Sequence, residues 1–362
     1  MKLFKCQHCA QLIYFENNAC ERCGHRLGYI AETATLSALE PQDGVWRALA
    51  GGSKLHRFCA NAGFGVCNWL IEADSPSVYC AACEHNRTVP DTSIQAYLTA
   101  WQKIEAAKHR LFYTLMQLGL PLKPQDGNGP GLIFDFLASP SAGGPSIMTG
   151  HDNGLITLAV EEADDAEREK RRTTMQEPYR TLLGHFRHEV GHYYWDALVR
   201  DGGHLGAFRK LFDDESADYG QALQAYYANG APLNWQDRFV SSYASAHPWE
   251  DFAETWAHYL HIVDTLEMAR AFGLYIRPRL SAELDAEVDF NPYRTRDVAP
   301  LIDTWVPLSN ALNSLNRSMG QPDVYPFILS PPVVEKLGFV HDLIHGNLKA
   351  AASVKSEPAT AG

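Results

Sequence analysis

No stretch of the sequence contains the run of about 18 apolar residues that a membrane-spanning helix requires. The N-terminus, MKLFKCQHCAQL, also lacks the apolar core of a signal peptide. Basic residues are too few to favour nucleic acid or an anionic membrane as the main partner. The 31 Lys and Arg are outnumbered by 43 Asp and Glu, which gives a net charge of −12. We therefore expect a cytoplasmic protein that does not contact membranes.

Cysteine is absent after residue 83, so all eight cysteines lie in the first quarter of the chain. Disulfides are rare in the cytoplasm, whereas paired C-x2-C knuckles suit zinc, because each knuckle turns two thiolates toward one point. The first four cysteines form two such knuckles: Cys6, Cys9, Cys20 and Cys23. They predict a structural zinc site in a ribbon at residues 1–30, with His8 and His25 as alternative ligands.

The second four cysteines are spaced less regularly: Cys59, Cys67, Cys80 and Cys83. The last two form an ordinary knuckle. Seven residues separate Cys59 from Cys67, and Gly63 and Gly65 between them would let the chain fold back sharply. We interpret residues 31–90 as a second four-cysteine zinc module. Buried free thiols and disulfides are the alternatives, and the sharing of cysteines between the two sites is left open.

After residue 90 the sequence becomes mainly helical. Apolar residues at helical spacing predict a helix over 94–118, and a short apolar run predicts a strand over 154–160. The acidic run at 161–167 predicts a solvated turn and the start of a helix. The small, polar residues 350–362 predict a disordered tail. The expected fold class is α+β, with small β-rich zinc modules before a mainly α-helical domain at 91–349 that has a short sheet.

Residues 177–200 predict one amphipathic helix that contains an H-E-x-x-H sequence. Its first turn would include Pro178. His188 and His192 lie one helical turn apart, so both can bind a single Zn²⁺, and Glu189 can act as general base on a water molecule. A chance match on a buried helix is the alternative.

Gly191 lies inside this helix, where glycine costs about 1 kcal/mol, so it indicates close packing beneath the site. A hydrolytic zinc site needs a third protein ligand. The metzincin pattern would place Gly at position 195 and His at position 198, but the sequence has Trp195 and Leu198. A carboxylate from a later helix is the remaining option. Pro248 suits the start of such a helix.

The segments HEVGHYYWD and YASAHPWEDFAETWAHYLH, together with the N-terminal cysteines, resemble a family described as "putative zinc-binding metallopeptidase" with a zinc ribbon. The second segment is also similar to lethal-factor-type gluzincins. The resemblance implies a zincin-like fold. It implies that His188, His192 and Glu250 bind the catalytic zinc and that Glu189 is the general base.

The same resemblance implies that Glu254 supports a ligand histidine and that Tyr243 hydrogen-bonds the oxyanion. Each residue has a simpler alternative: Tyr243 as a packing tyrosine and Glu254 as a surface carboxylate. His185 and His258 are rival ligands on suitable helix faces.

The expected function is that of a zinc-dependent metallopeptidase with one catalytic and two structural zinc ions. Its partners would be a peptide or protein substrate and a protein bound by the zinc ribbons. The alternatives are a non-catalytic zinc-binding adaptor and a nucleic-acid-binding protein that acts through the ribbons. The intact Glu189 argues against an adaptor, which needs no base, and the scarcity of basic residues argues against nucleic acid.

Overall fold

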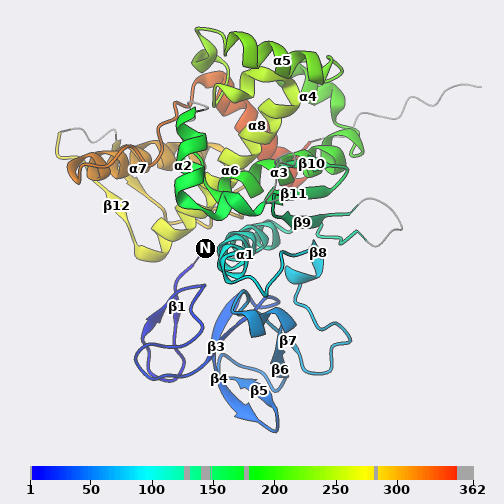
Figure 1. Ribbon diagram of the computed structural model, residues 1–362. Helices are drawn as coiled ribbons and strands as arrows, with labels where there is room; N and C mark the ends of the chain where they lie inside the picture. Colours follow the sequence, from blue (N-terminus) through cyan, green and yellow to red (C-terminus); the bar gives the residue numbers. More distant parts are fainter. Residues whose placement is uncertain are drawn as a thin grey trace, which may run out of the picture.

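The computed structural model describes residues 2–125, 131–139, 147, 149–174, 179–280 and 284–348. The tail expected at 350–362 and the helix start expected at Pro178 lie outside these residues. Figure 1 shows a β-rich N-terminal module below a larger helical domain, with helix α1 (Gln95–Leu118) between them. The α+β fold class is therefore confirmed.

The N-terminal module is built from short antiparallel strands. They are β1 (Phe4–Lys5), β2 (Leu12–Ile13), β3 (Leu27–Ile30), β4 (Thr35–Gln42), β5 (Val45–Ala48), β6 (Leu55–Phe58) and β7 (Leu70–Glu72). The first two form a hairpin, and β3 to β7 form one sheet in sequence order. A bridge between Tyr29 and Trp69 joins its first and last strands, so the sheet curls. This sheet spans the boundary predicted between residues 30 and 31.

A four-stranded sheet underlies the helical domain. In spatial order its strands are β10 (Gly150–Asp152), β11 (Leu155–Ala159), β9 (Ile133–Leu137) and β8 (Asn86–Thr88). Strands β11, β9 and β8 run parallel to one another. Strand β10 is an edge strand that pairs with β11 in the antiparallel direction. The strand predicted over 154–160 is thus β11. Helix α3 (Leu182–Tyr194) lies against β10.

Helices form most of the remaining domain. Those described are η3 (Val160–Ala163), α2 (Asp165–Thr174), α3, η4 (Trp195–Arg200), α4 (Leu205–Phe212), α5 (Tyr219–Asn229), η5 (Trp235–Asp237), η6 (Tyr243–Ala246), α6 (Pro248–Phe272), α7 (Ala299–Ser318) and α8 (Pro331–His345). A small hairpin joins β12 (Tyr275–Ile276) to β13 (Ala286–Glu287). Helices α3 and α6 pack against each other over much of their length.

The helix predicted over 177–200 differs from the structure at both ends. It begins only at Leu182, because the Thr181 hydroxyl accepts a hydrogen bond from the Gly184 amide (2.9 Å) and caps the first turn. The α-helix ends at Tyr194 and continues as the π-helix η4. A hydrogen bond from the Asp201 amide to the Asp196 carbonyl (2.9 Å) shows the wider π spacing.

The acidic run at 161–167 was expected to be a solvated turn and helix start, but part of it is buried. Glu162 is buried, and its carboxylate lies 2.6 Å from Arg171, 2.8 Å from Arg180 and 3.4 Å from His185. Burial alone would raise the pKa of Glu162, but His185 and the two guanidinium groups lower it overall. The expectation was wrong here because the cations that bury this carboxylate come from residues further along the chain.

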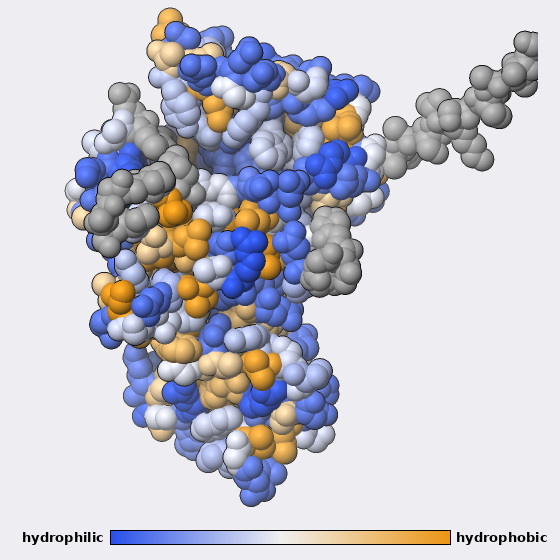
Figure 2. Space-filling view, turned by 45° about the vertical axis from the view of Figure 1, so that its right-hand side comes forward, coloured by the Kyte–Doolittle hydropathy of each residue, from blue (hydrophilic) through white to orange (hydrophobic). Residues whose placement is uncertain are grey.

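One continuous apolar core joins the two parts of the molecule. It contains Cys59 and Trp69 of the N-terminal module, Trp101 of α1 and Phe186 of α3. Full burial of a large apolar side chain contributes up to about 3 kcal/mol, so contacts of this kind hold the module firmly to the domain. On the face shown in Figure 2, hydrophobic residues (orange) gather mainly along the middle of the molecule. Among the described residues, no helix is long and apolar enough to cross a membrane.

Candidate metal centre

Helix α3 brings His188 and His192 together, one turn apart. Their Nε2 atoms lie 3.2 Å apart. His192 is buried and His188 nearly so. The apolar residues Phe186 and Val190 on the same helix are fully buried, which fixes the face that the two imidazoles present. The helix therefore holds two nitrogen atoms toward one point.

Glu250 reaches that point from the first turn of α6. The helix begins at Pro248, as predicted, and the His247 side chain caps it by accepting a hydrogen bond from the Trp249 amide (3.1 Å). Glu250 Oε2 lies 3.0 Å from His188 Nε2 and 3.6 Å from His192 Nε2. Burial would raise the pKa of Glu250, but the two histidines hold it well below its usual range.

These three atoms fit a zinc ion. A tetrahedral Zn²⁺ with bonds of about 2.0–2.1 Å places neighbouring ligand atoms about 3.3–3.4 Å apart, close to the separations found here. Glu250 Oε2 is buried and makes no hydrogen bond within the described part of the chain. Two imidazole nitrogens and one carboxylate oxygen are also the donor set of catalytic zinc sites.

Other side chains hold two of these residues in place. His188 Nδ1 donates to Glu254 Oε1 (2.7 Å), whose other oxygen accepts from the Ser241 hydroxyl (2.5 Å). Tyr219 donates its hydroxyl proton to Glu250 Oε1 (2.7 Å). Partners of this kind orient metal ligands and fix the histidine tautomer. Glu254 is therefore no free surface carboxylate.

Glu189 is 9% exposed and follows His188 on the same helix. Burial raises its pKa, and the nearby His188 and His192 only partly oppose this shift. A carboxylate with a raised pKa is better able to accept and return a proton near neutral pH.

Tyr243 lies in η6, with its ring centroid 6.0 Å from that of His188. Burial, and then the charge of Glu250, raise the pKa of its phenol far above the usual value, so the hydroxyl keeps its proton. The structure thus places a protonated phenol beside the candidate metal site.

The rival histidines point elsewhere. His185 lies 3.4 Å from Glu162, and His258 hydrogen-bonds Tyr325 (2.7 Å). Burial lowers the pKa of each to about 4, so both are neutral at physiological pH.

Sequence reasoning missed two residues of the site. One is Tyr219, which reaches Glu250 from the start of α5. The other is Trp249, whose ring centroid lies 3.9 Å from that of His192. A tryptophan directly before a candidate ligand was a signal that could have been used. No spacing rule links Tyr219 to Glu250.

The eight cysteines form two separate groups, and none is in a disulfide. In the first group, Cys6 Sγ lies 3.6 Å from Cys23 Sγ, and Cys9 Sγ lies 3.5 Å from Cys20 Sγ. A tetrahedron with Zn–S bonds of about 2.3 Å has edges of about 3.8 Å, so this group fits zinc. The ring of His8 stacks on that of His25 (centroids 4.1 Å apart) beside Cys23.

The second group is Cys59, Cys67, Cys80 and Cys83, all buried. Gly65 ends η1 (Ala60–Phe64) with a φ of +69°, which turns the chain back between the first two cysteines. Cys67 Sγ lies 3.8 Å from Cys80 Sγ and 3.3 Å from Nε2 of His109 on α1. The two groups are sequential, so no cysteine is shared between them.

A cavity of about 380 Å³ adjoins the His188–His192–Glu250 cluster. Residues of β10, η4, α5 and the α6 N-terminus contribute to its walls, among them His151, Trp195, Arg200, Tyr219 and Trp249. Burial lowers the pKa of His151 to about 3, so its imidazole is neutral.

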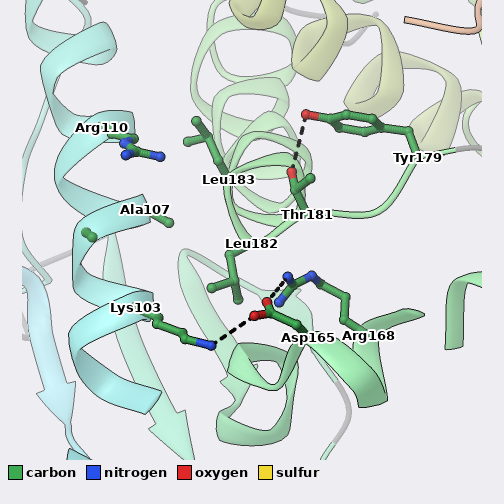
Figure 3. A pocket seen from close by; sticks show the side chains of 10 residues that line it. Lys103, Ala107, Arg110, Asp165, Arg168, Tyr179, Thr181, Leu182 and Leu183 are labelled. Carbon is green, nitrogen blue, oxygen red and sulfur yellow. Dashed lines mark hydrogen bonds and ion pairs between the residues drawn. The ribbon is translucent and has the colours of Figure 1, made fainter. Parts of the chain in front are cut away.

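A second cavity, of about 390 Å³, opens between α1, α2 and the start of α3 (Figure 3). Lys103 of α1 and Arg168 of α2 both bind Asp165 there, so its charges are largely paired with one another. None of the three candidate metal ligands lines it.

Comparison with known proteins gives a consistent result over nearly the whole chain. Residues 97–343 match the family described as "putative zinc-binding metallo-peptidase", and residues 3–94 match a zinc-ribbon domain. Uncharacterized proteins of Mycobacterium bovis and of two strains of Mycobacterium tuberculosis are each 41% identical over 346 residues, 95% of this chain and 95% of each relative. No solved structure shows a significant match. The chain belongs to the family described as "putative zinc-binding metallo-peptidase" and carries an N-terminal zinc-ribbon domain.

Proposed function

We propose that this protein hydrolyses peptide bonds with one catalytic zinc ion held by His188, His192 and Glu250. The convergence of two imidazole nitrogens and one buried carboxylate oxygen, which has no hydrogen-bond partner among the described residues, next to the buried Glu189, carries the proposal. Zinc would supply Lewis acidity, which polarises a carbonyl group and lowers the pKa of water toward about 7. Two structural zinc ions would occupy the cysteine groups.

The chain's own residues divide the remaining work. Glu189 accepts a proton from the attacking water on its carboxylate and returns it to the leaving amine. The hydroxyl group of Tyr243 donates a hydrogen bond to the oxyanion that forms on the substrate. Glu254 is a positioning residue, because its hydrogen bond to His188 Nδ1 leaves Nε2 as the ligand atom. Within the described part of the chain β10 is an edge strand beside α3, so its outer backbone groups can pair with an extended peptide.

Metal content and hydrolysis, measured on the same samples, test the proposal. Wild-type protein should hold three zinc ions and cleave fluorescently labelled unfolded casein. Glu189→Gln should keep three zinc ions and lose at least about 100-fold in activity, because only the base is removed. Glu250→Ala should hold two zinc ions, since the cysteine groups are untouched.

Tyr243→Phe separates an oxyanion donor from a packing tyrosine. We expect kcat to fall about 100-fold with zinc content and Tm unchanged, as for other oxyanion donors. A wild-type protein that holds three zinc ions but cleaves no peptide would instead favour the non-catalytic adaptor. A wild-type protein with two zinc ions, unchanged by Glu250→Ala, would refute the catalytic metal site.

A further inference from the structure

The 380 Å³ cavity beside the candidate metal centre, here called the acidic cavity, is lined by more acidic than basic side chains. Three carboxylates line it, from Asp152, Asp196 and Glu215, against the single guanidinium of Arg200. The three carboxylates and the one guanidinium together carry a net charge of −2. The acidic cavity therefore attracts a cation and repels an anion.

The ion pairs around these residues do not neutralise the acidic cavity. Arg200 forms ion pairs with both Asp196 (2.7 Å) and Asp201 (2.8 Å). Its positive charge is therefore shared with Asp201, a carboxylate outside the cavity lining. Arg209 pairs with Glu215 (2.8 Å). Adding Arg209 and Asp201 adds one charge of each sign, so the excess of negative charge stays.

Asp152 has no cationic partner within the described part of the chain. Among the described residues its carboxylate accepts one hydrogen bond, from the side-chain amide of the neighbouring Asn153 (2.8 Å). The residue is exposed at the end of the edge strand β10. Its carboxylate is thus available to a ligand without the loss of an existing ion pair.

Aromatic rings form the rest of the wall. Trp195 and Trp249 both line the acidic cavity, with their ring centroids 6.4 Å apart. Indole faces attract ammonium and guanidinium groups, most strongly where water is excluded. Carboxylates beside indoles form a suitable site for an organic cation.

None of the three candidate metal ligands lines the acidic cavity, but two of its lining residues contact them. Trp249 lies against His192, and Tyr219 hydrogen-bonds Glu250. Both are lining residues of the cavity. A group that fills it is therefore separated from His192 and Glu250 by the side chains of Trp249 and Tyr219.

We propose that the acidic cavity binds a cationic group of the peptide substrate, an ammonium or a guanidinium. The group would come from a Lys or Arg side chain or from the free amino terminus. This inference rests on the proposed peptidase function for its consequence in catalysis, but binding to the cavity can be measured without hydrolysis.

The binding experiment uses zinc-loaded Glu189→Gln, which is expected to bind peptide without cleaving it. Because Trp195 and Trp249 line the cavity, ligands should change the tryptophan fluorescence. The probes are N-acetylated, C-amidated peptides that differ at one position, Lys, norleucine or Glu, and the norleucine peptide with a free amino terminus. The Lys peptide or the free-amine peptide should bind about tenfold more tightly than the blocked norleucine peptide.

The variant Asp152→Asn, combined with Glu189→Gln, should remove most of this preference while leaving affinity for the norleucine peptide unchanged. Asp43→Asn is the matched control, because Asp43 is an exposed carboxylate in the turn between β4 and β5. It loses the same charge far from the cavity and should change nothing.

The same peptides, given to the wild-type enzyme, show whether binding and cleavage agree. A tenfold preference in kcat/KM for the Lys peptide identifies a side-chain subsite, and a preference for the free amine identifies an aminopeptidase. Equal binding of all four peptides, or an equal loss for all of them in Asp152→Asn, would overturn the inference. If the cationic peptides bound in an Asp152-dependent way but the wild-type protein cleaved none of them, the cation site would be supported and the proposed peptidase activity refuted.

Discussion

Gly191 of α3 lies directly against Ala253 of α6. A Cβ atom added at Gly191 would be 3.0 Å from Ala253 Cα and 3.3 Å from its carbonyl oxygen. Helix α3 provides two of the candidate zinc ligands and α6 provides the third. The glycine therefore sets the distance between the two halves of the site, as the close packing expected from the sequence suggested.

We predict that Gly191→Ala weakens zinc binding at the catalytic site. The added methyl group would clash with the backbone of α6. Because a helix backbone cannot shift locally without loss of stability, α3 must move away from α6. We expect a lower Tm and at least tenfold weaker binding of the third zinc ion, measured by chelator competition.

The control for this change is Gly206→Ala in α4, where the added Cβ has nothing within 4 Å. That variant should gain up to about 1 kcal/mol from helix propensity. If both variants were equally stabilised and bound zinc equally well, the close approach of α3 and α6 would not matter.

A second prediction concerns Tyr219. Its hydroxyl donates to Glu250 Oε1, and supporting hydrogen bonds of this kind typically change metal affinity by about 10–100-fold. Tyr219→Phe should therefore raise the zinc dissociation constant at the catalytic site by roughly tenfold. Tyr227→Phe on the same helix is the control, because Tyr227 is 66% exposed. Unchanged zinc affinity in Tyr219→Phe would show that Glu250 needs no such support.

A third prediction concerns His109 of α1, whose Nε2 lies 3.3 Å from Cys67 Sγ while its Nδ1 donates to the Glu105 carbonyl (2.7 Å). His109→Ala should release zinc from the second cysteine group about tenfold faster to a chromophoric chelator. The first cysteine group, which lacks this contact, serves as the internal control. Equal release from both groups would contradict a role for His109.

A fourth prediction follows from the lowered pKa of the buried Glu162. A carboxyl group whose pKa is lower in the folded than in the unfolded protein stabilises the fold above its usual pKa of 4.5, and this stabilisation is lost as the pH falls below that value. Glu162→Gln should cost about 2–3 kcal/mol at pH 7, since it removes the buried negative charge that Arg171 and Arg180 contact.

The difference in free energy of unfolding between Glu162→Gln and wild type should shrink as the pH falls below 4.5. Urea denaturation at several pH values measures this difference and cancels the effects of acid on the zinc sites, which both proteins share. A difference that is constant from pH 7 to pH 3 would contradict the proposed charge contacts.

Local patterns in the sequence predicted the parts of the fold that are set locally. Apolar spacing identified α1 and β11, and Pro248 identified the start of α6. The spacing of His188 and His192 is itself a helical repeat, so their approach followed from one helix. The glycine at position 65 similarly marked the turn inside the second cysteine group.

Contacts between distant segments could not be predicted in this way. Tyr219 and Glu250 are 31 residues apart, and His109 and Cys67 are 42 residues apart. Each pair is joined by packing of whole elements, which no short pattern records. The burial of Glu162 was missed for the same reason, because Arg171, Arg180 and His185 approach it only after folding.

The π-helix η4 begins at Trp195, three residues after His192, and supplies Trp195, Asp196 and Arg200 to the acidic cavity. Its wider turn holds one residue more than an α-helix would. Loss of a single residue there would turn every later side chain by about 100° around the axis, while His188 and His192 stayed in place. The gain or loss of one codon in this segment would therefore change which side chains line the acidic cavity, while the candidate zinc ligands stayed unaltered.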